Sequence, residues 1–293
     1  MVTVAIIAAG AMGSGVARRL VQHGCTVLTN LDGRSEATRK RAEGILQDVT
    51  YKEIRMRADY LLSILPPSSA YSFAESFLQE REKEADRSRD SELVFVDCNA
   101  VNPVTAKRIG ALFSGKPIRF VDAGIIGGPP SDGYDPTFYA SADDDGALER
   151  FERLAQYGLK ISTLRDGGGI GDASALKMSY AGMTKGTTAL FTIMILAAHD
   201  ASPQTAEALL NELSASQPEF LRRITRAIPP MLPKAYRWIG EMEEISEFVG
   251  GPAGDTYKGI AKVYERIENS LTGDKSDVEN LRKFIEEAKR RIE

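Results

Sequence analysis

The chain contains few of the side chains that most often bind metal ions or form nucleophile–base pairs. It has two histidines, His23 and His199, and two cysteines, Cys25 and Cys98, among its 293 residues. So few histidines argue against a histidine-based metal centre and against a Ser-His-Asp triad. The cysteines lie in apolar segments without the paired spacing of a metal site, so we interpret them as reduced core thiols.

Basic residues are not in excess either. The chain has 37 Lys and Arg against 41 Asp and Glu, a net charge of −4. Nucleic-acid-binding proteins usually carry a basic surplus, so we expect no nucleic-acid partner. The apolar N-terminal run has no positive segment before it and is interrupted by glycines, which favours neither a signal peptide nor a membrane span. We therefore expect a cytoplasmic protein with no membrane partner. Residues 80–90 are almost wholly charged and predict a solvated helix end and loop.

The first 30 residues have the pattern of a strand, a tight turn, a helix and a second strand. We expect the strands over residues 2–8 and 25–30 and the helix over residues 14–23. Such a turn lets the backbone approach a pyrophosphate and directs the free N–H groups of a helix N-terminus at it. The candidates for this contact are Gly10, Ala11, Met12 and Gly13. Ala8 stands at the first glycine position of the dinucleotide-binding pattern, so a turn without a ligand is the alternative.

A second cluster follows the second expected strand. Asp32 lies 19 residues after Gly13, near the position from which an acidic residue binds the ribose 2′-hydroxyl of NAD. Arg34 and Ser35 follow at the start of an expected helix, with Arg39 one turn later. A guanidinium, a hydroxyl and free N–H groups suit a 2′-phosphate, which favours NADP, with NAD as the alternative. An N-capped turn with solvated arginines would have the same pattern.

Strand and helix patterns alternate up to about residue 165 and then change. A glycine-rich segment leads into one long, mostly apolar helix over residues 173–199, and the remainder is helical with prolines between segments. We therefore predict an α/β Rossmann domain with a doubly wound parallel sheet over residues 1–165 and an all-α domain over residues 166–293. A long apolar helix usually buries its surface against another domain or subunit, so we expect a homodimer through the C-terminal helices.

Four blocks of sequence occur along the chain in a characteristic order. They are Ala8–Gly13, Ile64–Pro67, Asp122–Gly128 and Gly169–Lys177. Together they resemble the β-hydroxyacid dehydrogenase superfamily, which includes 3-hydroxyisobutyrate dehydrogenases, 6-phosphogluconate dehydrogenases and imine reductases. The resemblance covers residues 1 to about 198. The helical remainder is more similar to a divergent branch described as 6-phosphogluconate dehydrogenase-like.

The resemblance implies a role for residues in each block. Those implied to hold the pyrophosphate are Gly10, Ala11, Met12 and Gly13, and those implied to line the cofactor cleft are Leu65 and Pro66. Asn99 stands where the family has a Ser or Thr near the nicotinamide. Gly127 and Gly128 would offer N–H groups to a small-molecule substrate, and Lys177 matches the catalytic lysine.

Two positions depart from the pattern of the hydroxyacid dehydrogenases. Ile126 replaces a serine that binds the substrate carboxylate, and Tyr180 replaces an asparagine three residues after the lysine. These changes count against a simple β-hydroxyacid and favour a bulkier carbonyl compound or an imine. Trp238 lies in a helical segment that is a candidate to close the substrate pocket; an amphipathic dimer helix is the alternative.

Lys177 is the candidate general acid/base. A lysine partly buried at a cleft can have a lowered pKa and transfer a proton. Tyr180 lies beside it at a helical spacing of three and is the second catalytic candidate, either holding the lysine or donating a proton itself. A solvated lysine and a core tyrosine are the alternative interpretation. We predict an NADP-dependent oxidoreductase acting on a hydroxy or carbonyl substrate. The alternatives are an imine reductase on the same fold, in which Tyr180 matters more, and a non-catalytic NADP sensor.

Overall fold

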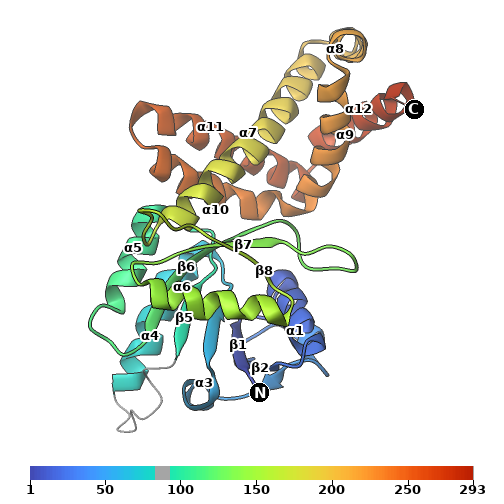
Figure 1. The fold of residues 1–293 in the computed structure, drawn as a ribbon. Coiled ribbons are helices and arrows are strands. Elements are labelled where there is room, and N and C mark those ends of the chain that lie inside the picture. The colour runs from blue at the N-terminus through green and yellow to red at the C-terminus, as the bar shows by residue number, and fades with distance from the viewer. Residues whose placement is uncertain (83–92, 293) are drawn as a thin grey trace. The chain divides into compact units, whose positions relative to one another are not determined.

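The computed structural model describes residues 1–82 and 93–292 (Figure 1). The chain divides into two compact units, Met1–Met178 and Ser179–Glu293, and the boundary falls within the long helix α7 (Asp172–Ala201). We describe each unit by itself. Most of the charged segment expected as a helix end and loop, residues 83–90, lies outside the described residues.

One sheet organises the first unit. Its strands are β1 (Thr3–Ile7), β2 (Thr26–Thr29), β3 (Gln47–Asp48), β4 (Tyr60–Ser63), β5 (Val94–Asp97), β6 (Arg119–Ile126), β7 (Thr137–Ser141) and β8 (Lys160–Thr163). Their order is β3-β2-β1-β4-β5-β6-β7-β8, and every neighbouring pair is parallel except β6 and β7. This is the predicted doubly wound sheet, and it confirms the fold class. No strand follows Thr163 in the part of the chain that the structure describes.

Helices cover both faces of this sheet (Figure 1). They are α1 (Ala11–Gln22), α2 (Glu36–Ala42), α3 (Tyr51–Arg57), α4 (Pro67–Glu82), α5 (Pro103–Leu112), α6 (Asp145–Glu152) and the 3₁₀ turn η2 (Arg153–Tyr157). Alternate residues of β1 point to opposite faces. Val4 and Ile6 belong to one core with α1 and α6, whereas Ala5 and Ile7 belong to the other with α3, α4 and α5. Strands covered on both faces are buried throughout, as β4 and β5 are.

The strand order reverses between β1 and β4. The chain leaves β1 toward β2 on one side, and it leaves β4 toward β5 on the other. In sheets of this kind the crevice at the carboxyl ends of the two diverging strands is the usual ligand site. The turn after β1 and the segment after β4 meet there, with the Ala8 N–H donating to the Ile64 carbonyl at 3.4 Å.

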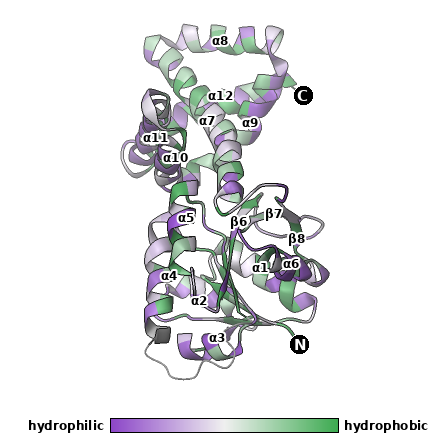
Figure 2. Cartoon of the chain, turned by 60° about the vertical axis from the view of Figure 1, so that its left-hand side comes forward, coloured by the Kyte–Doolittle hydropathy of each residue, from purple (hydrophilic) through white to green (hydrophobic). Residues whose placement is uncertain are grey.

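The second unit is helical. Besides the later turns of α7 it contains α8 (Pro203–Ser216), α9 (Pro218–Met231), η3 (Leu232–Lys234), α10 (Ala235–Val249), α11 (Gly251–Thr272) and α12 (Ser276–Ile292). Hydrophobic and hydrophilic stretches alternate along these helices (Figure 2), as expected for amphipathic helices around a shared core. Gly250 and Gly251 both have positive φ, at 69° and 53°, and make the corner between α10 and α11.

The unit boundary lies later than the predicted one at residue 165. The glycine-rich segment and the first turns of α7 belong to the first unit. Asp122 on β6 accepts hydrogen bonds from the Gly171 and Ser174 N–H groups, both at 3.0 Å, which ties the start of α7 to the sheet. The predicted boundary was placed where the composition changes. Composition cannot reveal these hydrogen bonds, because Gly171 and Ser174 lie 49 and 52 residues from Asp122 in the sequence.

Candidate active site

The turn between β1 and α1 has the geometry of a pyrophosphate cradle. Gly10 caps α1 without a side-chain hydrogen bond, and the first turn of α1 contains no acidic residue. A Cβ at Gly10 would meet nothing within 4 Å, so space is open beside this backbone. A Cβ at Gly13 would lie 2.0 Å from the Ala8 carbonyl oxygen, so glycine is required for the close packing there. Ala11 is exposed, and Met12 packs against the core. The open space at Gly10 and the N-terminus of α1 fit the pyrophosphate of a bound dinucleotide.

Asn99 organises the second side of the crevice. It is only 3% exposed, and its Oδ1 accepts the Leu65 N–H at 2.5 Å. Its Nδ2 donates to Ser63 Oγ at 3.0 Å and to the Asp97 carboxylate. The amide is thus engaged within the chain and fixes the backbone of Leu65, which is half-buried and is followed by the exposed Pro66. The resemblance implied that Asn99 lies near the nicotinamide; in the structure its amide is hydrogen-bonded to Leu65, Ser63 and Asp97.

The residues predicted to bind the ribose differ in whether they already have hydrogen-bond partners within the chain. Arg39 donates to the Leu31 carbonyl at 2.6 Å and to the Arg34 carbonyl at 3.3 Å, so it holds the turn after β2. Ser35 caps α2, its Oγ accepting the N–H of the residue at position 38 at 3.4 Å. Asp32 is exposed and accepts a hydrogen bond from the side chain of residue 30 at 3.0 Å. In the described part of the chain, the buried Nε of Arg34 has no hydrogen-bond partner.

Lys177 lies at the carboxyl end of β6. Its Nζ donates to the Ile125 carbonyl oxygen at 2.5 Å, and its side chain is half-buried. Gly124 makes this approach sterically feasible, since a Cβ there would lie 2.8 Å from the Ala173 carbonyl oxygen and 3.1 Å from the Lys177 Cβ. The strand and the helix therefore pack backbone to backbone at the lysine.

Asp122 anchors the helix that carries this lysine. It is 1% exposed, and Ser174 Oγ donates to its Oδ1 at 2.7 Å, in addition to the N–H groups of Gly171 and Ser174. Ser141 Oγ donates to Asp122 at 3.3 Å and accepts the Ala173 N–H at 3.0 Å. Burial raises the pKa of Asp122, while the hydrogen bonds from Ser174, Gly171 and Ser141 act in the opposite direction.

A second buried acid, Asp97, is the register neighbour of Asp122 on the adjacent strand. Burial, together with the nearby Asp122 charge, raises its pKa to about 7, and its Oδ2 has no hydrogen-bond partner among the described residues. Sequence reasoning missed both acids. The available signal was an Asp at the end of each of two apolar strand segments, residues 93–97 and 118–122.

The predicted substrate loop follows β6. Ile126, half-buried, ends the strand, and Gly127 has φ of 132°, where a Cβ would lie 2.2 Å from the Tyr134 hydroxyl. The Gly128 N–H donates to that hydroxyl at 3.2 Å, so one predicted substrate contact already has a partner in the chain. The loop is also tied to helix α1, because Arg19 Nε and the Asp135 carboxylate are 2.9 Å apart.

The remaining predicted residues belong to the second unit. Tyr180 follows the boundary in α7 and is 45% exposed. Trp238 on α10 is half-buried and packs edge-to-face on Tyr264, with ring centroids 5.1 Å apart. The structure therefore brings Lys177 together with Gly124 and Ile125, and it places Trp238 in a cluster of the helical unit.

Comparison with known families agrees with this geometry. Residues 3–161, more than half of the chain, match the NAD binding domain of 6-phosphogluconate dehydrogenase. The chain belongs to this family. It is thus an enzyme of the NAD(P)-dependent dehydrogenase and reductase type, as the sequence blocks predicted. Residues 201–267 match a domain of unknown function, DUF1932, and no curated protein sequence matches the chain.

Solved structures share the fold over nearly the whole chain. A conserved protein of unknown function, MTH1747, with structural similarity to 3-hydroxyacid dehydrogenases, is 25% identical, with 92% of this chain and 97% of that chain covered and a TM-score of 0.66. The 3-hydroxyisobutyrate dehydrogenase of Mycobacterium tuberculosis is 14% identical, with coverages of 91% and 99% and a TM-score of 0.62. An imine reductase variant from Myxococcus stipitatus is 17% identical, with coverages of 97% and 100% and a TM-score of 0.53.

Proposed function

We propose that this protein is an NADP-dependent oxidoreductase that interconverts a hydroxyl and a carbonyl group, with Lys177 as the general acid/base. The observation that carries the proposal is the position of Lys177 Nζ, which is held by the Ile125 carbonyl at the carboxyl end of β6. A bound nicotinamide supplies the hydride acceptor or donor.

The protein's own part in this reaction is to move a proton. In oxidation, neutral Lys177 accepts the proton of the substrate hydroxyl; in reduction, its ammonium group donates a proton to the carbonyl oxygen. The bonds from Ser174 and Gly171 to Asp122 hold the helix in place, so the lysine is positioned before any substrate binds. Gly10 and Gly13 supply the cradle for the pyrophosphate.

The preference for NADP over NAD rests on Arg34. Its buried Nε has no hydrogen-bond partner among the described residues, and a guanidinium binds a phosphate well. Ser35, next in the chain, adds a hydroxyl. Asp32 is the residue that would favour NAD, and it is already hydrogen-bonded by its neighbour at position 30.

An imine substrate is the second candidate function, favoured by the two departures from the hydroxyacid pattern. Ile126 offers no hydrogen bond to a carboxylate, and Tyr180 offers a phenol that is 45% exposed. A reductive aminase from Aspergillus terreus, solved with NADPH and ethyl-5-oxohexanoate, has the same fold at 15% identity and a TM-score of 0.54. In this case Tyr180, rather than Lys177, would be the important proton donor.

NADPH oxidation with a panel of aldehydes, ketones and imines tests these proposals. We expect Lys177→Ala to lose at least about a hundredfold in kcat on carbonyl compounds while its Kd for NADPH is unchanged. The exposed Lys160, on β8, provides the control variant Lys160→Ala. A larger loss in Tyr180→Phe, confined to imines, would favour the imine reductase. Tight NADPH binding without turnover of any panel member would instead indicate a sensor.

We also propose that the protein is a homodimer through its helical unit. Met183, Leu190 and Met194 on α7 are 65%, 56% and 60% exposed, and their spacing places them on one face of the helix. We expect Leu190→Glu to convert a dimer into a monomer, as measured by light scattering. A wild-type protein of monomer mass would overturn the proposal.

Helix α7 also has a second interpretation by length and composition. Within residues 1–82 and 93–292 it is the one helix long and apolar enough to cross a membrane, and 44% of its most apolar 18-residue window is buried. Its first turns bind Asp122, and the Tyr264 hydroxyl donates to the Lys185 carbonyl further along it at 2.6 Å. From these contacts we infer that α7 is a helix packed within the protein and not a membrane span.

A further inference from the structure

The helical unit contains a cavity of about 680 Å³ between α7, α9 and α10. Its wall is unusually rich in cations and aromatic rings. The lining residues that matter here are Lys185, Phe220, Arg222, Arg223, Arg226 and Trp238. All of them lie in the second unit, so the cavity is a feature of that unit alone.

Positive charge in this cavity exceeds the negative charge that the protein supplies. Arg222 pairs with Glu219, and Lys185 pairs with Glu241. In the described part of the chain, Arg223 and Arg226 form no hydrogen bond or ion pair, and both are exposed. They lie three residues apart on α9 and so project from the same side of the helix. Two guanidinium groups are therefore available to an anion.

Two residues that line the cavity, Lys185 and Trp238, are held by neighbouring side chains. Lys185 and Glu241 are 17% and 9% exposed, and Lys185 Nζ lies 5.0 Å from the centre of the Trp238 ring. Tyr264 packs edge-to-face on Trp238, and its hydroxyl donates to the Lys185 carbonyl at 2.6 Å. These contacts hold the indole as a rigid wall, so little side-chain freedom is lost when a ligand packs against it.

A second aromatic residue lines the cavity beside the arginines. Phe220 is 48% exposed, and its ring centre lies 5.4 Å from that of Phe191. The cavity thus has arginines for a charged group and aromatic surface for an apolar group. Arginine is well suited to phosphate and carboxylate, because its planar group donates two parallel hydrogen bonds.

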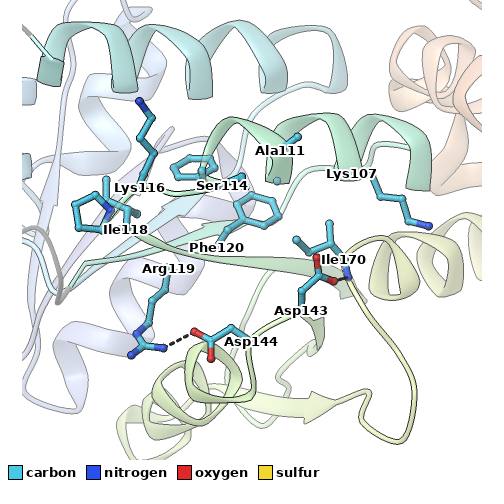
Figure 3. Close-up of a pocket in the computed structure, with 13 residues that line it drawn as sticks. Lys107, Ala111, Ser114, Lys116, Ile118, Arg119, Phe120, Asp143, Asp144 and Ile170 are labelled. Atoms are coloured by element: carbon cyan, nitrogen blue, oxygen red, sulfur yellow. Dashed lines mark hydrogen bonds and ion pairs between the residues drawn. The ribbon is translucent and has the colours of Figure 1, made fainter.

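A cavity of similar size in the first unit provides a contrast (Figure 3). It is about 720 Å³ and is lined by cations as well, but its arginine and both of its acids have partners within the protein. Arg119 pairs with Asp144, and Asp143 accepts the Ile170 N–H at 2.9 Å. Among the described residues that line this cavity, Arg119 is the one arginine and none is a tryptophan.

We propose that the cavity of the helical unit is a binding site for a small organic anion, a phosphate, phosphonate or carboxylate group carried on an apolar or aromatic body. Arg223 and Arg226 bind the anionic group, and Trp238 and Phe220 pack against the body. The site goes beyond the proposed oxidoreductase function, because it requires neither cofactor nor turnover.

Tryptophan fluorescence reports directly on this site, since Trp238 is the only tryptophan in the chain. The experiment titrates the full chain, without cofactor, with phenyl phosphate, benzoate, inorganic phosphate and benzyl alcohol, and calorimetry provides a second readout. We expect saturable binding of phenyl phosphate and benzoate, no binding of the uncharged alcohol, and affinity that falls with added salt. The relative affinities of phenyl phosphate and benzoate show which anionic group the site prefers.

Two variants decide the role of the arginines. Arg223→Ala/Arg226→Ala is expected to weaken binding at least tenfold, whereas Arg282→Ala, an exposed arginine on α12 outside the cavity, keeps wild-type affinity. Equal affinity in the double variant and in the control would overturn the proposal, as would equally tight binding of benzyl alcohol. Inorganic phosphate binding as tightly as phenyl phosphate would overturn the role of the aromatic wall. NADPH binding is measured separately. A protein that binds NADPH but none of these anions would overturn the anion site and leave the proposed oxidoreductase function intact.

Discussion

Asp97 and Asp122 are register neighbours on β5 and β6, and both are 1% exposed. Their chemical situations differ. Asp122 accepts hydrogen bonds from Gly171, Ser174 and Ser141. Asp97 accepts hydrogen bonds from Asn99 through Oδ1, and its Oδ2 has no partner in the described residues. An anionic Asp122 is thus stabilised by donors, and the neighbouring Asp97 is the acid that holds its proton to higher pH.

This difference predicts a pH dependence of stability. The pKa of Asp97 is about 7 in the folded protein against an ordinary value of 3.8, so between these values the folded state holds a proton that the unfolded chain has lost. Stability due to this group is present at low pH and is lost as the pH rises toward 7, by at most about 1.4 kcal/mol per pH unit. Asp97→Asn removes the titration, so we expect its Tm relative to wild type to rise between pH 5 and pH 8.

Asp132→Asn, at an exposed loop position, is the matched control and should leave the pH dependence of Tm unchanged. If the difference in Tm between Asp97→Asn and wild type were the same at both pH values, Asp97 would not be the titrating group.

Gly124 is predicted to be essential for the packing of α7 on β6. In Gly124→Ala the new methyl group would lie 2.8 Å from the Ala173 carbonyl oxygen and 3.1 Å from the Lys177 Cβ, so strand and helix must separate. We expect a loss of about 1–3 kcal/mol in the free energy of unfolding and a fall in kcat from the displaced lysine. Denaturant titration and NADPH oxidation measure the two effects.

Gly240→Ala is the control for this substitution. Gly240 lies inside α10, and a Cβ there meets nothing within 4 Å, so alanine should stabilise the helix by about 0.5–1 kcal/mol. Wild-type stability together with wild-type kcat in Gly124→Ala would contradict the close packing described here.

Local patterns in the sequence predicted much of the fold, because their partners are close in the chain. The turn from β1 into α1, the long helix α7 and the helical second unit all followed from such patterns. The anchoring of α7 by Asp122 did not, since its partner Ser174 lies 52 residues away. The resemblance identified Lys177 as a candidate, but it could not show that Tyr134 already occupies the Gly128 N–H. Neither could it show that Lys185 and Trp238 lie together.

Within one turn, Gly10 is predicted to be required for cofactor binding and Gly13 for packing. Gly10→Ala adds a methyl group to open space, where a pyrophosphate would lie, so we expect at least tenfold weaker NADPH binding at unchanged Tm. Gly13→Ala places a methyl group 2.0 Å from the Ala8 carbonyl oxygen, so we expect a lower Tm. Thermal unfolding and NADPH fluorescence titration of both variants check this, and unchanged NADPH affinity in Gly10→Ala would count against the cradle.

Variants of Arg34 and Arg39, which lie near the same turn, test whether the protein prefers NADPH over NADH. Because the buried Nε of Arg34 has no partner in the described residues, Arg34→Ala should weaken NADPH at least tenfold and leave NADH affinity unchanged. Arg39 instead holds the turn through the Leu31 and Arg34 carbonyls, so Arg39→Ala should lower Tm and weaken both cofactors alike. The ratio of the NADPH and NADH dissociation constants is the decisive measurement. If that ratio is the same in Arg34→Ala and wild type, Arg34 does not read the 2′-phosphate, and Asp32 becomes the residue that selects the cofactor.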